Sequence, residues 1–118
     1  MKVAVCEDQP EVRYTLSKIL SELPMVKKIE VYSDMDMCLG DIDEGNYYDV
    51  VFMEVDWKQE KTGIDYGKTI YKMSPYTKLI YIAADVEKYI ESIFLDGPKV
   101  SGLLKNPIDG IQVKKYMA

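Results

Sequence analysis

Hydrophobic residues along this chain follow two spacings in alternation, one typical of strands and one typical of helices. Residues 2–6, 49–55 and 78–84 are short runs of mostly apolar residues, and the second run is apolar at almost every position. An unbroken apolar run indicates a parallel strand that is covered on both faces. Residues 10–23 instead place apolar side chains on one helical face, at Val12, Leu16, Ile19, Leu20 and Leu23. That spacing predicts an amphipathic helix, with Pro10 in its first turn.

The remaining segments continue the alternation. The pattern predicts strands over residues 27–33 and 99–104, and helices over 63–73, 85–95 and 109–117. A further helix is expected between a cap at Ser33 or Asp34 and the terminating pair Gly45-Asn46. Five strands alternating with five helices indicate an α/β fold, an open parallel sheet with helices on both faces. No linker, repeat or low-complexity segment divides the 118 residues, so we expect one domain over residues 1–118.

Composition and charge narrow the class of protein. The chain is 47% hydrophobic and 30% charged, as folded soluble domains are. Its net charge of −5 argues against nucleic-acid binding by this domain alone. No apolar run approaches the roughly 18 residues needed to span a bilayer, and the N-terminus lacks a cleavage site. We therefore expect a cytoplasmic protein without membrane contact.

The cysteines and the absence of histidine restrict the chemistry further. Cys6 and Cys38 fit no metal-binding or redox spacing, so they predict two packed, reduced thiols. The chain contains no histidine. Histidine-based catalytic triads, imidazole metal sites and phosphohistidine chemistry are thereby excluded.

Charged residues gather at the predicted strand ends, where parallel sheets place their sites. Glu7 and Asp8 follow the first strand, Glu54 and Asp56 end the third, and Lys105 ends the fifth. Carboxylates that converge in one cleft need a cation or a shared proton, and Mg²⁺ suits a site with few carboxylates. The alternative is that Glu7 and Asp8 only cap the helix that starts at residue 10.

Two enzyme or carrier classes on the same architecture fit less well. A flavin-mononucleotide carrier needs a loop rich in serine, threonine and glycine after the first strand, but "CEDQPEV" places two acids there. A phosphohydrolase with an aspartyl nucleophile needs aspartate where "FMEVD" has Glu54. We expect no enzymatic activity.

Four motifs in order resemble the receiver domain of two-component response regulators over nearly the whole chain. They are "VAVCEDQPEVR", "YDVVFMEVD", Gly63 and "GLLKNPI". The second and fourth are most similar to receivers joined to LytTR-type DNA-binding domains. The resemblance implies a flavodoxin-like (βα)5 fold, a doubly wound five-stranded parallel sheet with strand order 2-1-3-4-5.

The resemblance also implies roles for the residues at the strand ends. In the family, an acidic pair at Glu7 and Asp8 holds Mg²⁺ together with the backbone carbonyl of Asp56. A lysine at the position of Lys105 pairs with the phosphoryl group. These residues are kept here, so the resemblance implies weak Mg²⁺ binding.

Three positions depart from the family pattern. Glu54 replaces the phosphoacceptor aspartate, Ala83 replaces a threonine or serine that binds the phosphoryl group, and Gly102 replaces an aromatic switch residue. The loop after Glu54 also lacks the usual proline and is one residue longer. Together these departures predict a degenerate receiver in which Glu54 forms a permanent ion pair with Lys105. The alternative is a receiver that is phosphorylated at Asp56 or Glu54.

The resemblance suggests partners as well. Receivers commonly pair through the fourth helix, fifth strand and fifth helix, here about residues 85–117, including Tyr89, Glu91, Lys99 and Lys115. A sensor histidine kinase is a second expected partner. Control of transcription would act through a C-terminal LytTR-type domain that this sequence does not contain, and a free-standing adaptor is the alternative.

Overall fold

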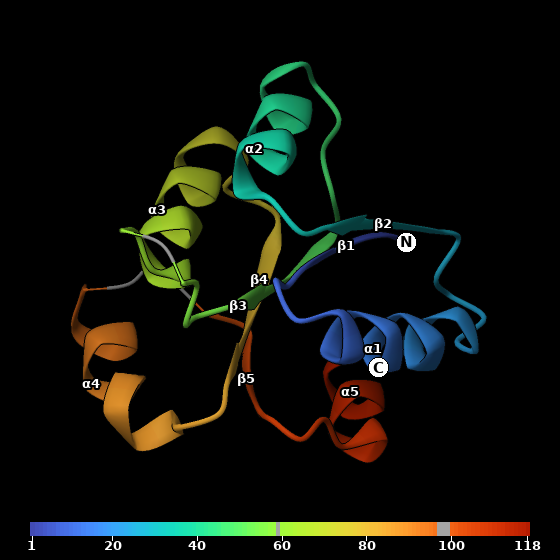
Figure 1. Ribbon diagram of the computed structural model, residues 1–118. Helices are drawn as coiled ribbons and strands as arrows, with labels where there is room; N and C mark the ends of the chain where they lie inside the picture. The colour runs from blue at the N-terminus through green and yellow to red at the C-terminus, as the bar shows by residue number, and fades with distance from the viewer. Residues whose placement is uncertain (59, 97–99) are drawn as a thin grey trace.

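The predicted α/β fold is confirmed by the computed structural model, which describes residues 1–58, 60–96 and 100–118 (Figure 1). A five-stranded parallel sheet has the order β2-β1-β3-β4-β5. The strands are β1 (Lys2–Cys6), β2 (Lys28–Tyr32), β3 (Val50–Glu54), β4 (Lys78–Ala83) and β5 (Gly102–Lys105). The helices are α1 (Pro10–Ser21), α2 (Met35–Asp43), α3 (Gly63–Met73), α4 (Val86–Asp96) and α5 (Gly110–Met117).

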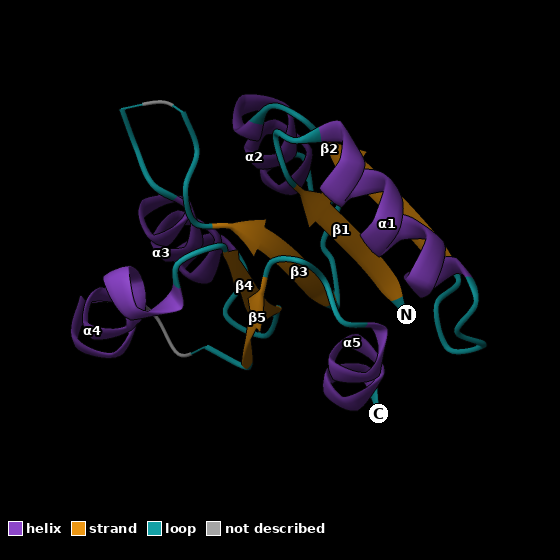
Figure 2. Ribbon diagram, turned by 60° about the horizontal axis from the view of Figure 1, so that its bottom comes forward, coloured by secondary structure: helices purple, strands orange, loops and turns teal. Residues whose placement is uncertain are grey.

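The helices cover the sheet from both sides (Figure 2). Helices α1 and α5 pack on one face through residues such as Leu16 and Val113, and α2, α3 and α4 pack on the other. Strand β3 supplies both cores, because Val51 and Met53 face α2–α4 while Phe52 faces α1 and α5. This two-sided burial explains why the third strand is apolar at almost every position.

Local signals set the helix starts. Of the two predicted caps for α2, Asp34 is the one used, and its carboxylate accepts a hydrogen bond from the backbone N–H of Asp36 at 2.8 Å. Helix α3 begins with a reciprocal capping box between Thr62 and Asp65. Strand β5 begins at Gly102, three residues later than predicted, and residue 99 of the predicted strand lies outside the described residues. Within the described ranges, no helix has the length and apolarity to cross a membrane.

Two glycines let α3 approach the sheet closely. A Cβ atom on Gly63 would lie 1.9 Å from the backbone oxygen of Glu54, and the Gly63 N–H donates to Val55 O at 2.8 Å. A Cβ atom on Gly67 would lie 2.0 Å from the hydroxyl oxygen of Tyr81 on β4. A larger residue at Gly63 would require a shift of the backbone, and one at Gly67 a shift of the Tyr81 side chain. The Gly63 contact holds the start of α3 against the end of β3, where the candidate site lies.

Candidate functional site

The first two predicted site residues meet at the carboxyl ends of neighbouring strands. Strands β1 and β3 pair in parallel, with Cys6 beside Met53. Glu7 and Glu54 directly follow this pair of residues, one on each side. Glu7 is 0% exposed and Glu54 is 5% exposed. Arg13 on α1 holds this end of β1, because its guanidinium donates to the backbone oxygen of Glu7 at 2.9 Å.

A side-chain hydrogen bond between the two buried carboxyl groups is among the causes of their pKa shifts. Two ionised carboxylates cannot form such a bond, because neither has a proton to donate. Oε1 of Glu7 accepts a hydrogen bond from the Gln9 N–H at 3.0 Å, while its buried Oε2 receives none. Because no donor reaches Oε2, Glu7 is able to carry the proton that such a bond needs.

Electrostatics agrees with this assignment. Burial and the hydrogen bond to Glu54 raise the pKa of Glu7 to about 10, against the lowering effect of the Gln9 N–H. Burial also raises the pKa of Glu54, but the hydrogen bonds from Glu7 and from the Asp56 N–H oppose that rise. The Asp56 N–H donates to Oε1 of Glu54 at 3.0 Å. At neutral pH Glu7 is thus the member of the pair that holds a proton.

The predicted ion pair between Glu54 and Lys105 is wrong. Across the described ranges the ion pair that forms is Lys28–Glu30 at 3.3 Å, and Glu54 takes part in none. The sheet places β4 between β3 and β5, with Ile82 beside Glu54 and Ala83 beside Lys105, so an ion pair would have to reach across one strand. The Lys105 side chain is exposed at the end of β5, whereas Glu54 bonds to Glu7 on the β1 side.

The residues that the resemblance assigns to Mg²⁺ offer a partial donor set. Oδ1 of the half-buried Asp8 and Oε2 of Glu7 are buried carboxyl oxygens without a hydrogen-bond donor. No group of three or more histidine, cysteine, aspartate or glutamate side chains suited to a metal exists among the residues that the structure describes. Mg²⁺ keeps most of its waters and needs only one or two carboxylates, so Glu7, Asp8 and the carbonyl of Asp56 fit it. A bound cation would neutralise the carboxylates, in competition with the proton on Glu7.

The two remaining positions that depart from the family pattern, Ala83 and Gly102, are closely packed. Ala83 is fully buried at the end of β4, and its carbonyl accepts from the Asn106 N–H at 3.0 Å. Gly102 leaves room for the ring of Tyr116 on α5, because a Cβ atom there would lie 2.8 Å from that ring. The Tyr116 hydroxyl donates to Leu103 O at 3.2 Å. Glycines in strands often allow a ligand or another backbone to approach closely. Gly102 instead allows the close approach of an aromatic side chain.

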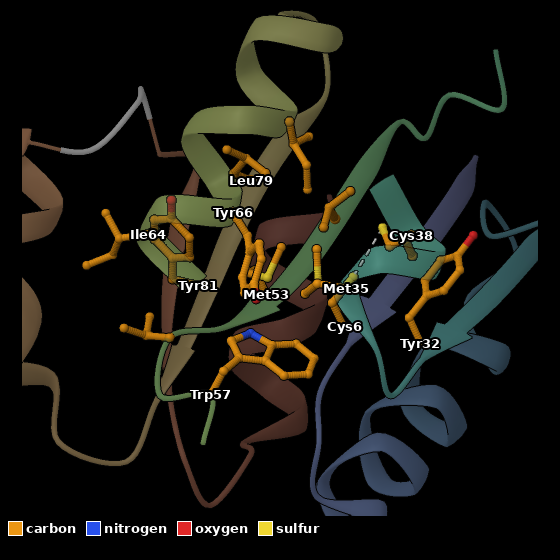
Figure 3. Packing of buried hydrophobic residues seen from close by; sticks show 14 of the residues in the cluster. Cys6, Tyr32, Met35, Cys38, Met53, Trp57, Ile64, Tyr66, Leu79 and Tyr81 are labelled. Carbon is orange, nitrogen blue, oxygen red and sulfur yellow. Dashed lines mark hydrogen bonds between the residues drawn. The ribbon is translucent and has the colours of Figure 1, made fainter. Parts of the chain in front are cut away.

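Two residues near the site were not identified as site residues from the sequence. Trp57 lies in the loop after β3, is 3% exposed, and packs its ring edge-on against Tyr66 with centroids 6.1 Å apart (Figure 3). Lys88 on α4 faces the site: the neighbouring Tyr89 and, less strongly, the Asp56 carboxylate raise the pKa of its amine. The helical spacing of α4 gave no signal for Lys88, because exposed charged positions are common on any helix.

Comparison with known proteins assigns the fold. The sequence matches no family model and no curated protein. Many solved structures are similar in shape, and three of them show the extent of the likeness. The receiver domain of a CheY-like protein from Methanospirillum hungatei JF-1 has a TM-score of 0.80 at 13% identity, covering 98% of this chain and 89% of that one. CheY4 of Vibrio cholerae has a TM-score of 0.78 at 21% identity, covering 98% and 94%.

The third similar structure is the N-terminal domain of a response regulator/sensory box/GGDEF protein from Carboxydothermus hydrogenoformans. It has a TM-score of 0.82 at 16% identity, covering 99% of this chain and 90% of that one. These identities are low, so the likeness shows a shared fold. The chain therefore has the fold of response-regulator receiver domains, with the strand order that the sequence predicted.

Proposed function

We propose that this chain is a receiver-type signalling domain that does not run a phosphorylation cycle and acts by binding another protein. The observation that carries the proposal is the hydrogen-bonded pair of Glu7 and Glu54 at the ends of β1 and β3. It stands where the resemblance puts the acceptor aspartate and one of the acids that hold Mg²⁺. Here both carboxyl groups are engaged with each other.

The geometry supports the loss of phosphoryl transfer in three ways. The Glu54 carboxylate accepts a hydrogen bond from the Asp56 N–H and interacts with Glu7, and both contacts lower its basicity and so weaken it as a nucleophile. Its extra methylene displaces the attacking oxygen, and a misplacement of about 1 Å can cost roughly a hundredfold in rate. Ala83 has no hydroxyl to order a transferred group. In-line phosphoryl transfer depends on positioning and charge neutralisation, so these losses reinforce one another.

Phosphodonor treatment tests the proposal. The protein, incubated with Mg²⁺ and acetyl phosphate, is expected to gain no stoichiometric phosphoryl group on Glu54 or Asp56, and beryllium fluoride should not bind tightly. Intact mass and peptide mapping measure the first outcome, and calorimetry measures the second. The matched variant Glu54→Asp with Ala83→Thr restores the shorter acid and the hydroxyl, so it should gain measurable labelling. Labelling of the unmodified chain at either acid would contradict the proposal.

The proposed partner is a second copy of this chain, bound through α4, β5 and α5. Large apolar side chains are exposed there: Ile90, Phe94 and Leu95 on α4, and Ile111 on α5. Lys99, which was predicted to belong to this face, lies outside the described residues. A dimer is expected in light scattering at high concentration, and Phe94→Glu should shift it toward monomer. A monomer at every concentration would remove this part of the proposal.

Further partners belong to the same proposal. A sensor histidine kinase would meet the domain at the carboxyl ends of the strands, where Glu54 lies. Regulation of transcription would require a LytTR-type DNA-binding domain outside this sequence, because a chain with net charge −5 repels phosphate backbones. Supporting observations are the receiver fold and the "YDVVFMEVD" and "LLKNPI" motifs.

A further inference from the structure

The two cysteines meet inside the core beside the candidate site. Sγ of Cys6, the last residue of β1, lies 3.7 Å from Sγ of Cys38 in the middle of α2 (Figure 3). Both side chains are 0% exposed, although 31 residues separate them in the sequence. The thiols hydrogen-bond to each other. The sequence spacing of the two cysteines gave no sign of this contact.

We propose that Cys6 and Cys38 are an oxidation site, at which a peroxide or a small-molecule disulfide converts the two thiols into a reversible disulfide. The thiols lose two protons and two electrons, and one S–S bond forms. A peroxide takes up the two protons and two electrons as its O–O bond breaks. A disulfide oxidant takes them up as it is reduced to two thiols. An S–S bond is about 2.05 Å long, so the sulfurs must approach by under about 2 Å.

The surroundings make this reaction slow and conditional. Both sulfurs are sealed from solvent, so an oxidant reaches them only when α2 opens away from β1. Helix α2 has nine residues and lies toward the β2 edge of the sheet (Figure 1), where local opening involves few elements. A thiol pair of this kind stays reduced under ordinary cytosolic conditions and responds to oxidant. The contact with Cys38 and burial also raise the pKa of Cys6, so little thiolate forms and the disulfide is expected only under sustained oxidant.

Oxidation would act directly on the carboxyl pair. Cys6 immediately precedes Glu7, and the new bond would tie this end of β1 to α2. Met53, which precedes Glu54, and Trp57 belong to the same buried cluster as the two cysteines (Figure 3). Movement of Cys6 is therefore transmitted to both strand ends and to the Trp57 ring. This inference does not depend on the proposed function, because it concerns thiol chemistry alone.

Oxidation of the whole chain with hydrogen peroxide or diamide tests the inference. The expected product is a monomer that has lost two hydrogens, has no free thiol after denaturation and yields a Cys6–Cys38 peptide on mapping. Its urea midpoint should rise above that of the reduced protein, its Trp57 emission should change, and dithiothreitol should reverse both effects. Cys38→Ala and Cys6→Ala, with one thiol each, should show neither change.

The wild-type result decides the matter even where a variant folds poorly. As a control, the same oxidant is applied to the protein unfolded in urea, where both thiols should be consumed. The inference is overturned when both thiols of the folded protein survive that treatment. It is also overturned when the products are only intermolecular disulfides or over-oxidised cysteines. An internal disulfide that leaves Trp57 emission unchanged would contradict the transmission to the strand ends.

Discussion

Replacement of Glu7 by glutamine is expected to stabilise the domain at pH 7 by up to about 3 kcal/mol. The folded chain buries Glu7 as a neutral acid with a pKa of about 10, while the unfolded chain releases that proton near pH 4.5. At pH 7 folding therefore includes the cost of returning a proton to Glu7. Glutamine is neutral in both states, and its amide can donate to Glu54 as the acid does.

The same substitution is expected to remove most of the pH dependence of stability. A folded-state pKa raised above the unfolded value gives stability that is fully present below about pH 4.5 and is lost as pH rises toward 10. For one proton, the free energy of unfolding of the wild type falls by up to about 1.4 kcal/mol per pH unit inside that window. Urea unfolding between pH 5 and 9, in the presence of a chelator, measures the slope.

A matched control separates the buried pair from general charge effects. Glu11 lies in the first turn of α1, is exposed, and carries the same charge. Glu11→Gln removes that charge without touching the Glu7–Glu54 contact, so its pH profile should follow the wild type. If the free energy of unfolding varies with pH equally in the wild type and in Glu7→Gln, then Glu7 is ionised in the folded chain. That result would contradict a proton shared between Glu7 and Glu54.

Much of the fold and the composition of the site could be predicted because they follow from periodicity. The unbroken apolar run before Glu54 indicated a two-sided strand, and the alternation of elements fixed the sheet class. Parallel strands end at one edge, so Glu7 and Glu54 had to come near each other. Carboxylate repulsion then left two resolutions, a cation or a shared proton, and the raised pKa of Glu7 favours the proton.

The choice of partner for each side chain could not be predicted in the same way. Glu54 and Lys105 do end strands at one edge, but the rotamer of Glu54 and the intervening β4 decide which neighbour it reaches. The contact of Tyr116 with Gly102 joins α5 to β5 through side-chain packing. The burial of Trp57 likewise depends on how α3 docks. These contacts depend on three-dimensional packing, which periodicity does not encode.

The docking of α3 leads to the largest expected loss of stability, in Gly63→Ala. Its Cβ atom would lie 1.9 Å from a backbone oxygen and 2.8 Å from two backbone carbons of β3 and the residue that follows it. Backbone cannot rotate away as a side chain can, so we expect a loss of about 3 kcal/mol or more in the free energy of unfolding. Urea unfolding measures this loss of stability. Because the obstacle is backbone, no second substitution of a neighbouring side chain should recover the lost stability.

Gly67→Ala is expected to behave differently, because its obstacle is a side-chain hydroxyl. Alone it should cost about 2 kcal/mol, even after the better helix propensity of alanine is counted. Tyr81→Phe removes the atom 2.0 Å away, and that hydroxyl is buried without a hydrogen-bond partner among the described residues, so its loss alone should be close to neutral. The double variant should therefore recover at least half of the loss, since the ring carbon then lies 3.0 Å away. Additive losses would mean that α3 already shifts to admit the methyl group, and the close approach of Gly67 to Tyr81 would not be what fixes α3 against β4.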